Sequence, residues 1–383
     1  MSLGQFLSSH WARFQAELFP FLDDALGPLT PAHRSLVVIL DMVQIETLVR
    51  HWSGLPGRPQ AERAALARAF IAKAAFNLAT TRMLIDRLRA DPVLRRLCGW
   101  SRLGQVPHEA TFSRAFAEFS QSELPQKAHE ALIALTHKDR LVGHIARDAT
   151  AIHGREKSGK RKEPAAAEPK IVRKRGRPRK GEEPPPKEPR RISSQAAGMS
   201  LSAMLADLPT TCDVGIKRNA KGYQESWIGY KLHIDTADGD IPISCILTSA
   251  SVHDSQVAIP LATLTSTRVT NCYDLMDSAY DVPEIADHSR SLGHIPIIDV
   301  NPRRTPGRKQ EIADEAKRLR LVGHVPAQHI RYNQRSSAER VNAALKDSHG
   351  GNTIRVRGHQ KVMCHLMFGI LAISVQQIFR LVT

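Results

Sequence analysis

Four residues that can bind metal ions or phosphate share one face of the segment YNQRSSAERVNAALK, residues 332–346. At about 100° per residue, a helix over this segment places Tyr332, Arg335, Glu339 and Lys346 within roughly 60° of one another. The opposite face carries apolar residues, as expected of a helix that packs against a core. Alone, this polar face is typical of a solvated helix surface. It becomes a candidate site only if further carboxylates meet Glu339.

Two aspartates stand at the ends of predicted strands. The segment RLVGHIARDAT predicts a strand that ends at Asp148, and TNCYDLMDSAY predicts one that carries Asp277. If these strands are neighbours in one sheet, Glu339 on a helix across the sheet completes a set of oxygen ligands that suits Mg²⁺ and phosphodiester chemistry. The alternative for each aspartate is an ordinary residue of the turn that ends a strand. Asp235 and Asp254 have similar positions, so spacing alone does not choose among them.

The composition indicates a soluble protein with an anionic partner. The 383 residues allow two or three domains, and 42% hydrophobic residues are enough for sizeable cores. The net charge of +16 favours nucleic acid over a membrane surface, because no amphipathic basic anchor stands out.

Nothing in the sequence predicts a membrane span or a secretion signal. The longest apolar run, LMFGILAISV at residues 366–375, is shorter than the roughly 20 residues that a span needs. Five scattered cysteines without a CxxC pair indicate reduced thiols and argue against a zinc module. We therefore expect a cytoplasmic protein.

The chain divides into two predicted regions. Residues 1–138 have apolar positions at spacings of three and four residues, which predicts an all-helical N-terminal domain. Residues 139–383 contain predicted strands and helices, among them a β-hairpin closed at residues 238–240, a helix near residues 283–292 and a last apolar helix from about 358 to 380. This order predicts an α+β fold with a mixed sheet and helices packed against it.

One segment of the helical region is a candidate for DNA recognition. VPHEATFSRAFAEF predicts a helix that docks through three phenylalanines. With the preceding helix it can form a helix-turn-helix that presents Thr111, Ser113 and Arg114 to DNA. The alternative is a helical bundle with an ordinary polar surface, and periodicity leaves both readings open.

A basic, proline-rich insertion occupies residues 155–200 of the second region. Residues 155–191 hold fifteen Lys or Arg, six Glu and seven Pro, which is +9 of the net +16, and this composition predicts disorder in the free protein. The sequence RKRGRPRKG within it resembles an AT-hook, an element that binds the minor groove of A/T-rich DNA. Gly176 and Pro178 would hold the backbone extended along the groove floor while Arg175 and Arg177 enter the narrow, negative groove. The alternative is a charged linker that binds phosphates without sequence preference.

Several other residues near the acidic positions have a functional and a structural explanation of similar weight. A histidine at a strand end is more often structural, and a lysine or an aromatic residue there often lies on a solvated face or packs under a site. These residues are His153, His233, His253, Lys221, Lys231, Tyr280 and Trp227.

The motifs together carry a family resemblance. DATAI around Asp148, DSAYD around Asp277 and the spacing Tyr332-x2-Arg335-x3-Glu339-x6-Lys346 resemble bacterial insertion-sequence transposases of the DDE type, whose last motif is Y-R-E-K. All four positions of that motif match. GYKLHIDTADGDIPI and TSASVHDSQ look like the sheet and turn of the same catalytic domain, and residues 55–116 contain segments similar to the helical domain that precedes it. The resemblance covers most of the chain except the insertion.

The resemblance implies a ribonuclease H-like catalytic domain in which the first and fourth strands are parallel neighbours. It implies that Asp148, Asp277 and Glu339 hold two Mg²⁺ or Mn²⁺ ions. The implied activity is cut-and-paste transposition: cleavage at terminal inverted repeats frees 3′-hydroxyls, which are joined to target DNA by transesterification in a complex that contains a dimer. The positions implied to bind transposon-end DNA are Tyr332, Arg335 and Lys346.

Two other functions fit the same residues. An inactive derivative would hold A/T-rich DNA without cutting it, and a non-specific metal-dependent nuclease of the same fold would cut DNA that lacks repeats and give no joined product. The 62 residues from Asp277 to Glu339 leave no room for a large β-rich insertion, so the sequence does not decide whether the transposon end passes through a hairpin intermediate.

Overall fold

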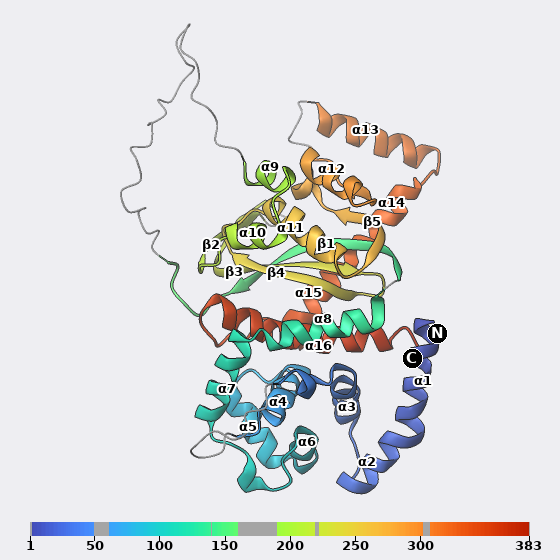
Figure 1. The fold of residues 1–383 in the computed structure, drawn as a ribbon. Helices are drawn as coiled ribbons and strands as arrows, with labels where there is room; N and C mark the ends of the chain where they lie inside the picture. The colour runs from blue at the N-terminus through green and yellow to red at the C-terminus, as the bar shows by residue number, and fades with distance from the viewer. Residues whose placement is uncertain are drawn as a thin grey trace.

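The computed structural model describes residues 2–49, 61–138, 140–159, 190–218, 222–301 and 307–382. Within these ranges a helical region precedes a mixed sheet that is flanked by helices (Figure 1). This confirms the predicted α+β fold, and the sheet is consistent with a ribonuclease H-like catalytic domain. The AT-hook-like residues 175–178 and Lys221 lie outside the described residues.

The first region contains helices and no strand among its described residues. Local signals account for several helix starts: the side chains of Ser2, Thr30, Thr80 and Asp91 each accept a hydrogen bond from the backbone N–H three residues later. The helices are α1 (Leu3–Arg13), a π-helical turn (Phe14–Leu18), α2 (Phe19–Leu26), α3 (Pro31–Val43), a 3₁₀ turn (Ile45–Leu48), α4 (Arg63–Ala75), α5 (Thr81–Ala90), α6 (Pro92–Cys98), a 3₁₀ turn (Leu103–Gln105), α7 (Glu109–Gln121) and α8 (Leu124–His137).

The aromatic helix predicted in this region is α7. Its Phe112, Phe116 and Phe119 are buried around Phe70 of α4, with ring centroids 5.0–6.2 Å from that ring. Each such pair adds to the burial of apolar surface, and together they fix α7 on the bundle. Ser113 and Arg114 are exposed on the other side of the helix, and Thr111 is half-buried.

The second region is built on a sheet with six strands among the described residues. Strand β3 lies between β1 and β4, to both of which it is antiparallel, and its first half pairs with β2. On the other side β1 is parallel to β5, and β5 is parallel to β6. The strands are β1 (Leu141–His153), β2 (Asp213–Arg218), β3 (Gln224–Ala237), β4 (Ile241–Ser249), β5 (Thr270–Met276) and β6 (Ile295–Ile298).

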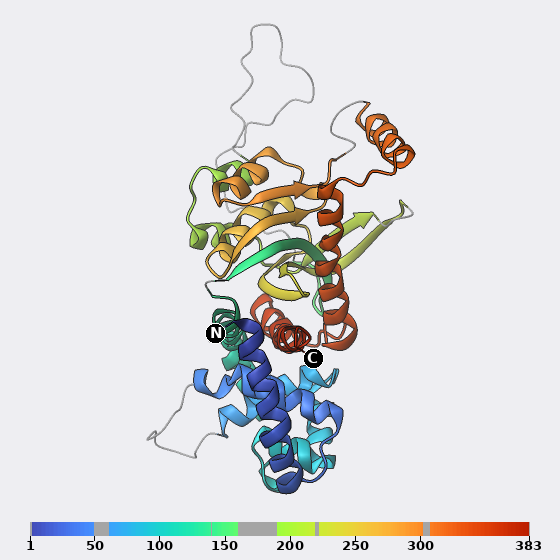
Figure 2. The ribbon, with the colours of Figure 1, turned by 90° about the vertical axis from the view of Figure 1, so that its right-hand side faces the viewer.

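Helices cover both faces of this sheet (Figures 1 and 2). The predicted hairpin is formed by β3 and β4. Three residues, 238–240, connect the strands, and two of them, Gly239 and Asp240, have positive φ angles, which glycine and aspartate adopt more readily than most residues. The predicted helix after Asp277 is α12, and the predicted last helix is α16. The helices are α9 (Arg191–Ala196), α10 (Leu201–Asp207), α11 (Ser255–Ser266), a 3₁₀ turn (Ser278–Tyr280), α12 (Pro283–Ser291), α13 (Arg308–Leu321), α14 (Ala327–Tyr332), a 3₁₀ turn (Asn333–Arg335), α15 (Ser336–Ser348) and α16 (His359–Phe379).

Helix α16 is buried between the helical region and the sheet (Figure 2). Its Phe368 packs on Phe70 and Phe116, while Leu366 and Ile370 lie in a core formed with β3 and β4. Among the described residues it is the one helix long and apolar enough to cross a membrane, and 83% of its most apolar window is buried inside the protein. Its apolar surface on all sides is therefore explained by packing, and the helix joins the two regions through shared cores.

Two element boundaries differ from the predictions. The strand predicted to end at Asp148 was wrong, because β1 continues to His153 by pairing residues 149–153 with β3. A single helix over residues 332–346 was also wrong, because a 3₁₀ turn separates α14 from α15. There the Ser336 hydroxyl donates to the Asn333 carbonyl at 3.0 Å, a local hydrogen bond that competes with regular helix.

A buried ion pair ties the central strands together. Arg147 of β1 donates to both carboxylate oxygens of Asp235 on β3, from Nε at 2.8 Å and from Nη2 at 2.7 Å, and its Nη1 contacts Met276 Sδ of β5 at 3.3 Å. Both partners are at most 2% exposed. Burial lowers the pKa of Arg147, but the Asp235 and Asp274 carboxylates outweigh it and raise this pKa above its ordinary value.

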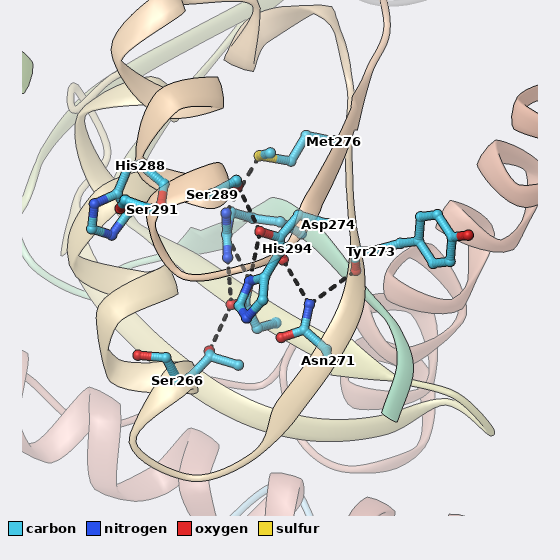
Figure 3. A network of polar contacts seen from close by, with 12 residues as sticks. Ser266, Asn271, Tyr273, Asp274, Met276, His288, Ser289, Ser291 and His294 are labelled. Atoms are coloured by element: carbon cyan, nitrogen blue, oxygen red, sulfur yellow. Dashed lines mark hydrogen bonds and ion pairs between the residues drawn. The ribbon is translucent and has the colours of Figure 1, made fainter. Parts of the chain in front are cut away.

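The same network extends to β5 and α12 (Figure 3). Asp274 accepts hydrogen bonds from Ser289 Oγ at 2.6 Å and from Asn271 Nδ2 at 3.1 Å, and it contacts His294 Nδ1 at 3.1 Å. Burial raises the pKa of Asp274, but His294, the charge of Arg147 and the Ser289 hydrogen bond together lower it below its usual range. The carboxylate is therefore ionised and fully partnered inside the protein.

We predict that Arg147→Met lowers the free energy of unfolding by about 3–5 kcal/mol, because Asp235 then becomes an uncompensated buried charge. The double variant Arg147→Met/Asp235→Leu should recover most of that loss. Urea unfolding measures both. The matched control is Arg340→Met, which removes a bidentate pair with Asp240 from the surface and should cost less than about 1 kcal/mol. Equal losses for Arg147→Met and the control would contradict the account.

Candidate active site

The parallel pairing of β1 and β5 brings two of the predicted site residues together. The register pairs Ile145 with Asp274 and Ala146 with Leu275. Continuing it by two residues places Asp148 level with Asp277, on neighbouring strands. Asp277 follows the last residue of β5, as predicted, and its Oδ1 accepts a hydrogen bond from the Ala279 N–H at 2.9 Å.

Both carboxylates are in a setting that opposes their ionisation. Burial raises the pKa of Asp148 to about 6, and the negative charges of Asp277 and Asp254 act in the same direction against the positive charge of Arg335. Burial also raises the pKa of Asp277, with Asp254 adding to the effect and Arg335 opposing it. Two like charges that face each other in a partly dry site favour a bound cation.

Helix α15 packs across the sheet and contributes the next polar groups. Asn342 Nδ2 donates to Asp148 Oδ2 at 3.0 Å, which fixes the helix against β1. Glu339 lies one turn before Asn342 on this helix, but its Oε1 accepts a hydrogen bond from Arg335 Nη2 at 2.6 Å, and its side chain is 54% exposed. The structure therefore brings α15 to the aspartates while Glu339 is held by Arg335.

The other three residues of the last motif surround the same place. Arg335 lies over the Tyr332 ring at 5.7 Å, and its buried Nε has no hydrogen-bond partner among the described residues. Burial raises the pKa of Tyr332, with the charge of Asp277 among the minor causes. Burial and the nearby Lys217 lower the pKa of Lys346, against the opposing charge of Asp148. A free guanidinium N–H and a half-buried ammonium group beside acidic residues suit a phosphate.

Asp254 is a carboxylate at this site that the sequence did not single out. It stands before α11, and its charge acts on both Asp148 and Asp277. Its Oδ1 accepts a hydrogen bond from Lys231 Nζ at 2.9 Å, and His233 Nδ1 lies 3.9 Å from the same oxygen. Lys231 is therefore paired with Asp254 inside the site and does not lie free on the surface.

Two aromatic residues with open roles pack inside the protein. Tyr280 is 1% exposed and its hydroxyl has no hydrogen-bond partner among the described residues, so it lies under the aspartates rather than on the surface. Trp227 is buried and donates from Nε1 to the Tyr230 carbonyl at 3.0 Å. His253 contacts Ser255 Oγ at 2.8 Å, and His153 is exposed.

The donor set fits a hard divalent cation in part. Asp148 and Asp277 supply paired, partly buried oxygen ligands with an excess of negative charge, which is what Mg²⁺ or Mn²⁺ would offset. Among the described residues, however, no group of three or more His, Cys, Asp or Glu side chains is placed to hold a metal ion. Glu339 joins the two aspartates only if it leaves Arg335.

Two regions of the chain match known families. Residues 207–375 match the family model of the transposase DDE domain, and residues 24–118 match that of a transposase domain designated DUF772. The matches support a transposase, and more particularly an insertion-sequence transposase of the DDE type. The first match includes Asp277 and Glu339, whereas Asp148 lies before it. No curated protein and no solved structure matches the chain significantly.

The residues that sequence analysis missed had weak or no local signals. Asn342 is three residues after Glu339, and that helical spacing could have placed it on the same face. Asp254 was visible only as one of several aspartates near strand ends. The Arg147–Asp235 pair had no signal, because it depends on the β1–β3 register.

We predict that Asp148→Asn stabilises the metal-free protein at pH 8. The folded-state pKa of about 6 lies above the ordinary 3.8, so ionised Asp148 opposes folding above pH 6 and this cost disappears as the pH falls from 6 to 4. The gain should be roughly 2 kcal/mol at pH 8 and near zero at pH 4. Urea unfolding in EDTA measures it. The control Asp287→Asn, on the surface of α12, should show little change, and a destabilised Asp148→Asn protein at pH 8 would contradict the prediction.

Proposed function

We propose that this chain is an active DNA transposase of an insertion sequence, which cleaves at terminal inverted repeats and joins the freed 3′-hydroxyls to target DNA. The observation that carries the proposal is the register of β1 and β5, which sets Asp148 level with Asp277 under a helix that carries Glu339. The two family matches support it independently of this geometry.

In this proposal Asp148, Asp277 and Glu339 would hold two Mg²⁺ or Mn²⁺ ions. Such ions activate the attacking water or hydroxyl and stabilise the leaving oxygen in phosphodiester chemistry. Asn342 orients Asp148 through its amide donor. Arg335, released from Glu339, offers its unpartnered Nε and its Nη2 to a phosphate oxygen as a bidentate pair.

The ion pair between Arg335 and Glu339 is then the resting arrangement of the site. A DNA phosphate competes with Glu339 for the guanidinium, and the freed carboxylate can turn toward the aspartates. DNA binding and completion of the ligand set are thereby linked. Because synapsis requires two transposon ends, we also propose a dimer on the DNA, acting in the cytoplasm at the nucleoid.

We predict that Asp148→Asn, Asp277→Asn and Glu339→Gln each reduce Mg²⁺-dependent cleavage of a linear transposon end by more than about 100-fold. End binding should stay within a few-fold, because these residues are not its main contacts. Gel assays of cleavage and of strand joining measure both steps. Asp287→Asn should retain wild-type activity.

The same assay separates the proposal from its alternatives. A wild-type chain that binds A/T-rich DNA but neither cuts nor joins would be an inactive derivative. A chain that cuts DNA without repeats and gives no joined product would be a non-specific nuclease. Retained cleavage in all three variants would overturn the assignment of the acidic residues.

We propose separately that the segment around Arg175, Gly176, Arg177 and Pro178 binds the minor groove of A/T-rich DNA. The double variant Arg175→Ala/Arg177→Ala should bring the ratio of affinities for A/T-rich and G/C-rich duplexes close to one, since the groove-inserted side chains are lost. Fluorescence anisotropy measures the ratio. Lys160→Ala/Lys162→Ala removes the same charge outside the motif, and an equal effect of both variants would identify a non-specific linker.

A further inference from the structure

A basic cavity of about 730 Å³ lies between the helical region and the start of α16. Its walls come from α4, α5 and α7, from the segment after β1, and from the first turns of α16 with the segment before it. Among the described residues, five that line it are cationic, and Glu109, which pairs with Arg82 at 3.8 Å, is the one lining carboxylate. The cationic residues are Lys73, Arg155, Arg355, Arg357 and Lys361.

Lys73 is the observation that points to a bound anion. The residue is 9% exposed, and its ammonium group, which opens into the cavity, makes no hydrogen bond or ion pair with the described residues. Burial lowers its pKa to about 8, so it is mostly protonated at neutral pH. The neighbouring His365 is neutral, because burial and the charge of Lys73 lower its pKa to about 4. A buried, unpartnered cation is costly unless an anion reaches it.

The other walls favour the same kind of ligand. Thr80, the N-cap of α5, and Thr81 line the cavity, so the positive end of that helix faces it. Arg355, Arg357 and Lys361 are exposed, and Arg155 is fixed beside them by donating to the Arg355 carbonyl at 3.2 Å. Cations spread over several elements suit a run of phosphates better than one small anion.

We propose that this cavity binds backbone phosphates of the DNA strand whose reacting phosphodiester lies at Asp148. This rests on the proposed function for the position of the reacting bond. Arg155 follows Asp148 by seven residues, over which a fully extended chain spans at most about 23 Å. Phosphates along one strand are about 3.4 Å apart along the helix axis, so the contacted phosphates lie within roughly seven nucleotides of the reacting bond.

The geometry makes one DNA molecule touch both regions of the protein. The cavity contains side chains from α4, α5 and α7 of the helical region and from the segment that leads into α16. A DNA strand bound both in the cavity and at the acidic residues would contact the helical region and the sheet region, which α16 already joins. The contact is independent of base sequence, because it is made to phosphates.

The test is the salt dependence of binding to a 40-base-pair duplex of arbitrary sequence in EDTA, where no cleavage occurs. Lys361→Gln and Lys73→Met should each lower the slope of log K against log salt concentration by about 1 and weaken binding several-fold. Lys73→Met should also raise the thermal midpoint of the DNA-free protein. The matched control is Arg380→Gln, about 29 Å away at the other end of α16, which should leave the slope unchanged.

Ethylation interference on a transposon end should place the affected phosphates within roughly seven nucleotides of the cleaved bond. Unchanged slopes in both cavity variants, Lys361→Gln and Lys73→Met, would overturn the cavity proposal. If these two variants still cleave a transposon end, the proposed function stands without it. The opposite result is also informative. If the cavity variants change the slope but the Asp148, Asp277 and Glu339 variants still cleave DNA, the cavity proposal stands and the assigned catalytic residues are rejected. Inorganic phosphate, added at constant ionic strength, tests for a small anion. If it raises the thermal midpoint of the wild type more than that of Lys73→Met, while the two proteins have equal salt slopes for DNA binding, the cavity binds a small anion and the proposal is wrong.

Discussion

The acidic site depends on the buried ion pair between Arg147 and Asp235. Side chains alternate along a strand, so Arg147 and Met276 point to one face of the sheet, and the residues that directly follow them, Asp148 and Asp277, point to the other. The bidentate pair fixes β1 against β3, and the Arg147–Met276 contact joins β1 to β5. A shift of one residue in either pairing would move an aspartate to the wrong face. Burying the arginine costs free energy of folding, and in return the ion pair fixes the positions of two carboxylates.

The second constraint is the apolar helix α16, which unites the two regions. Its contacts with α4, α7 and β4 make the helical region and the sheet share hydrophobic cores. Helix α15, which carries Glu339, packs on the same core through Val341 and Leu345. The polar side of α15 and the basic cavity at the start of α16 are therefore supported by one packed interior. The anion-binding surface that we propose would therefore draw on both regions.

Local patterns in the sequence predicted the helices, strands and turns better than the contacts between them. The hairpin turn at Gly239 and Asp240, the strand end before Asp277 and the aromatic face of α7 have short-range signals, and each is confirmed. The continuation of β1 past Asp148 and the roles of Asp254 and Arg147 depend on contacts between residues distant in sequence, which periodicity does not report. The motif on residues 332–346 predicted four site residues, and their roles stay a prediction; the pairing of Glu339 with Arg335 depends on a competition between charges that spacing cannot resolve.

The central claim is that Asp148, Asp277 and Glu339 form one divalent-metal centre when DNA is bound. The most direct measurement counts Mn²⁺ bound to the protein–DNA complex, by the loss of the EPR signal of free Mn²⁺. The account predicts uptake that saturates at two ions per chain on DNA and falls in Asp148→Asn, Asp277→Asn and Glu339→Gln, with the Glu339 effect present only on DNA. Uptake of the same number of ions by the wild type and all three variants would contradict it.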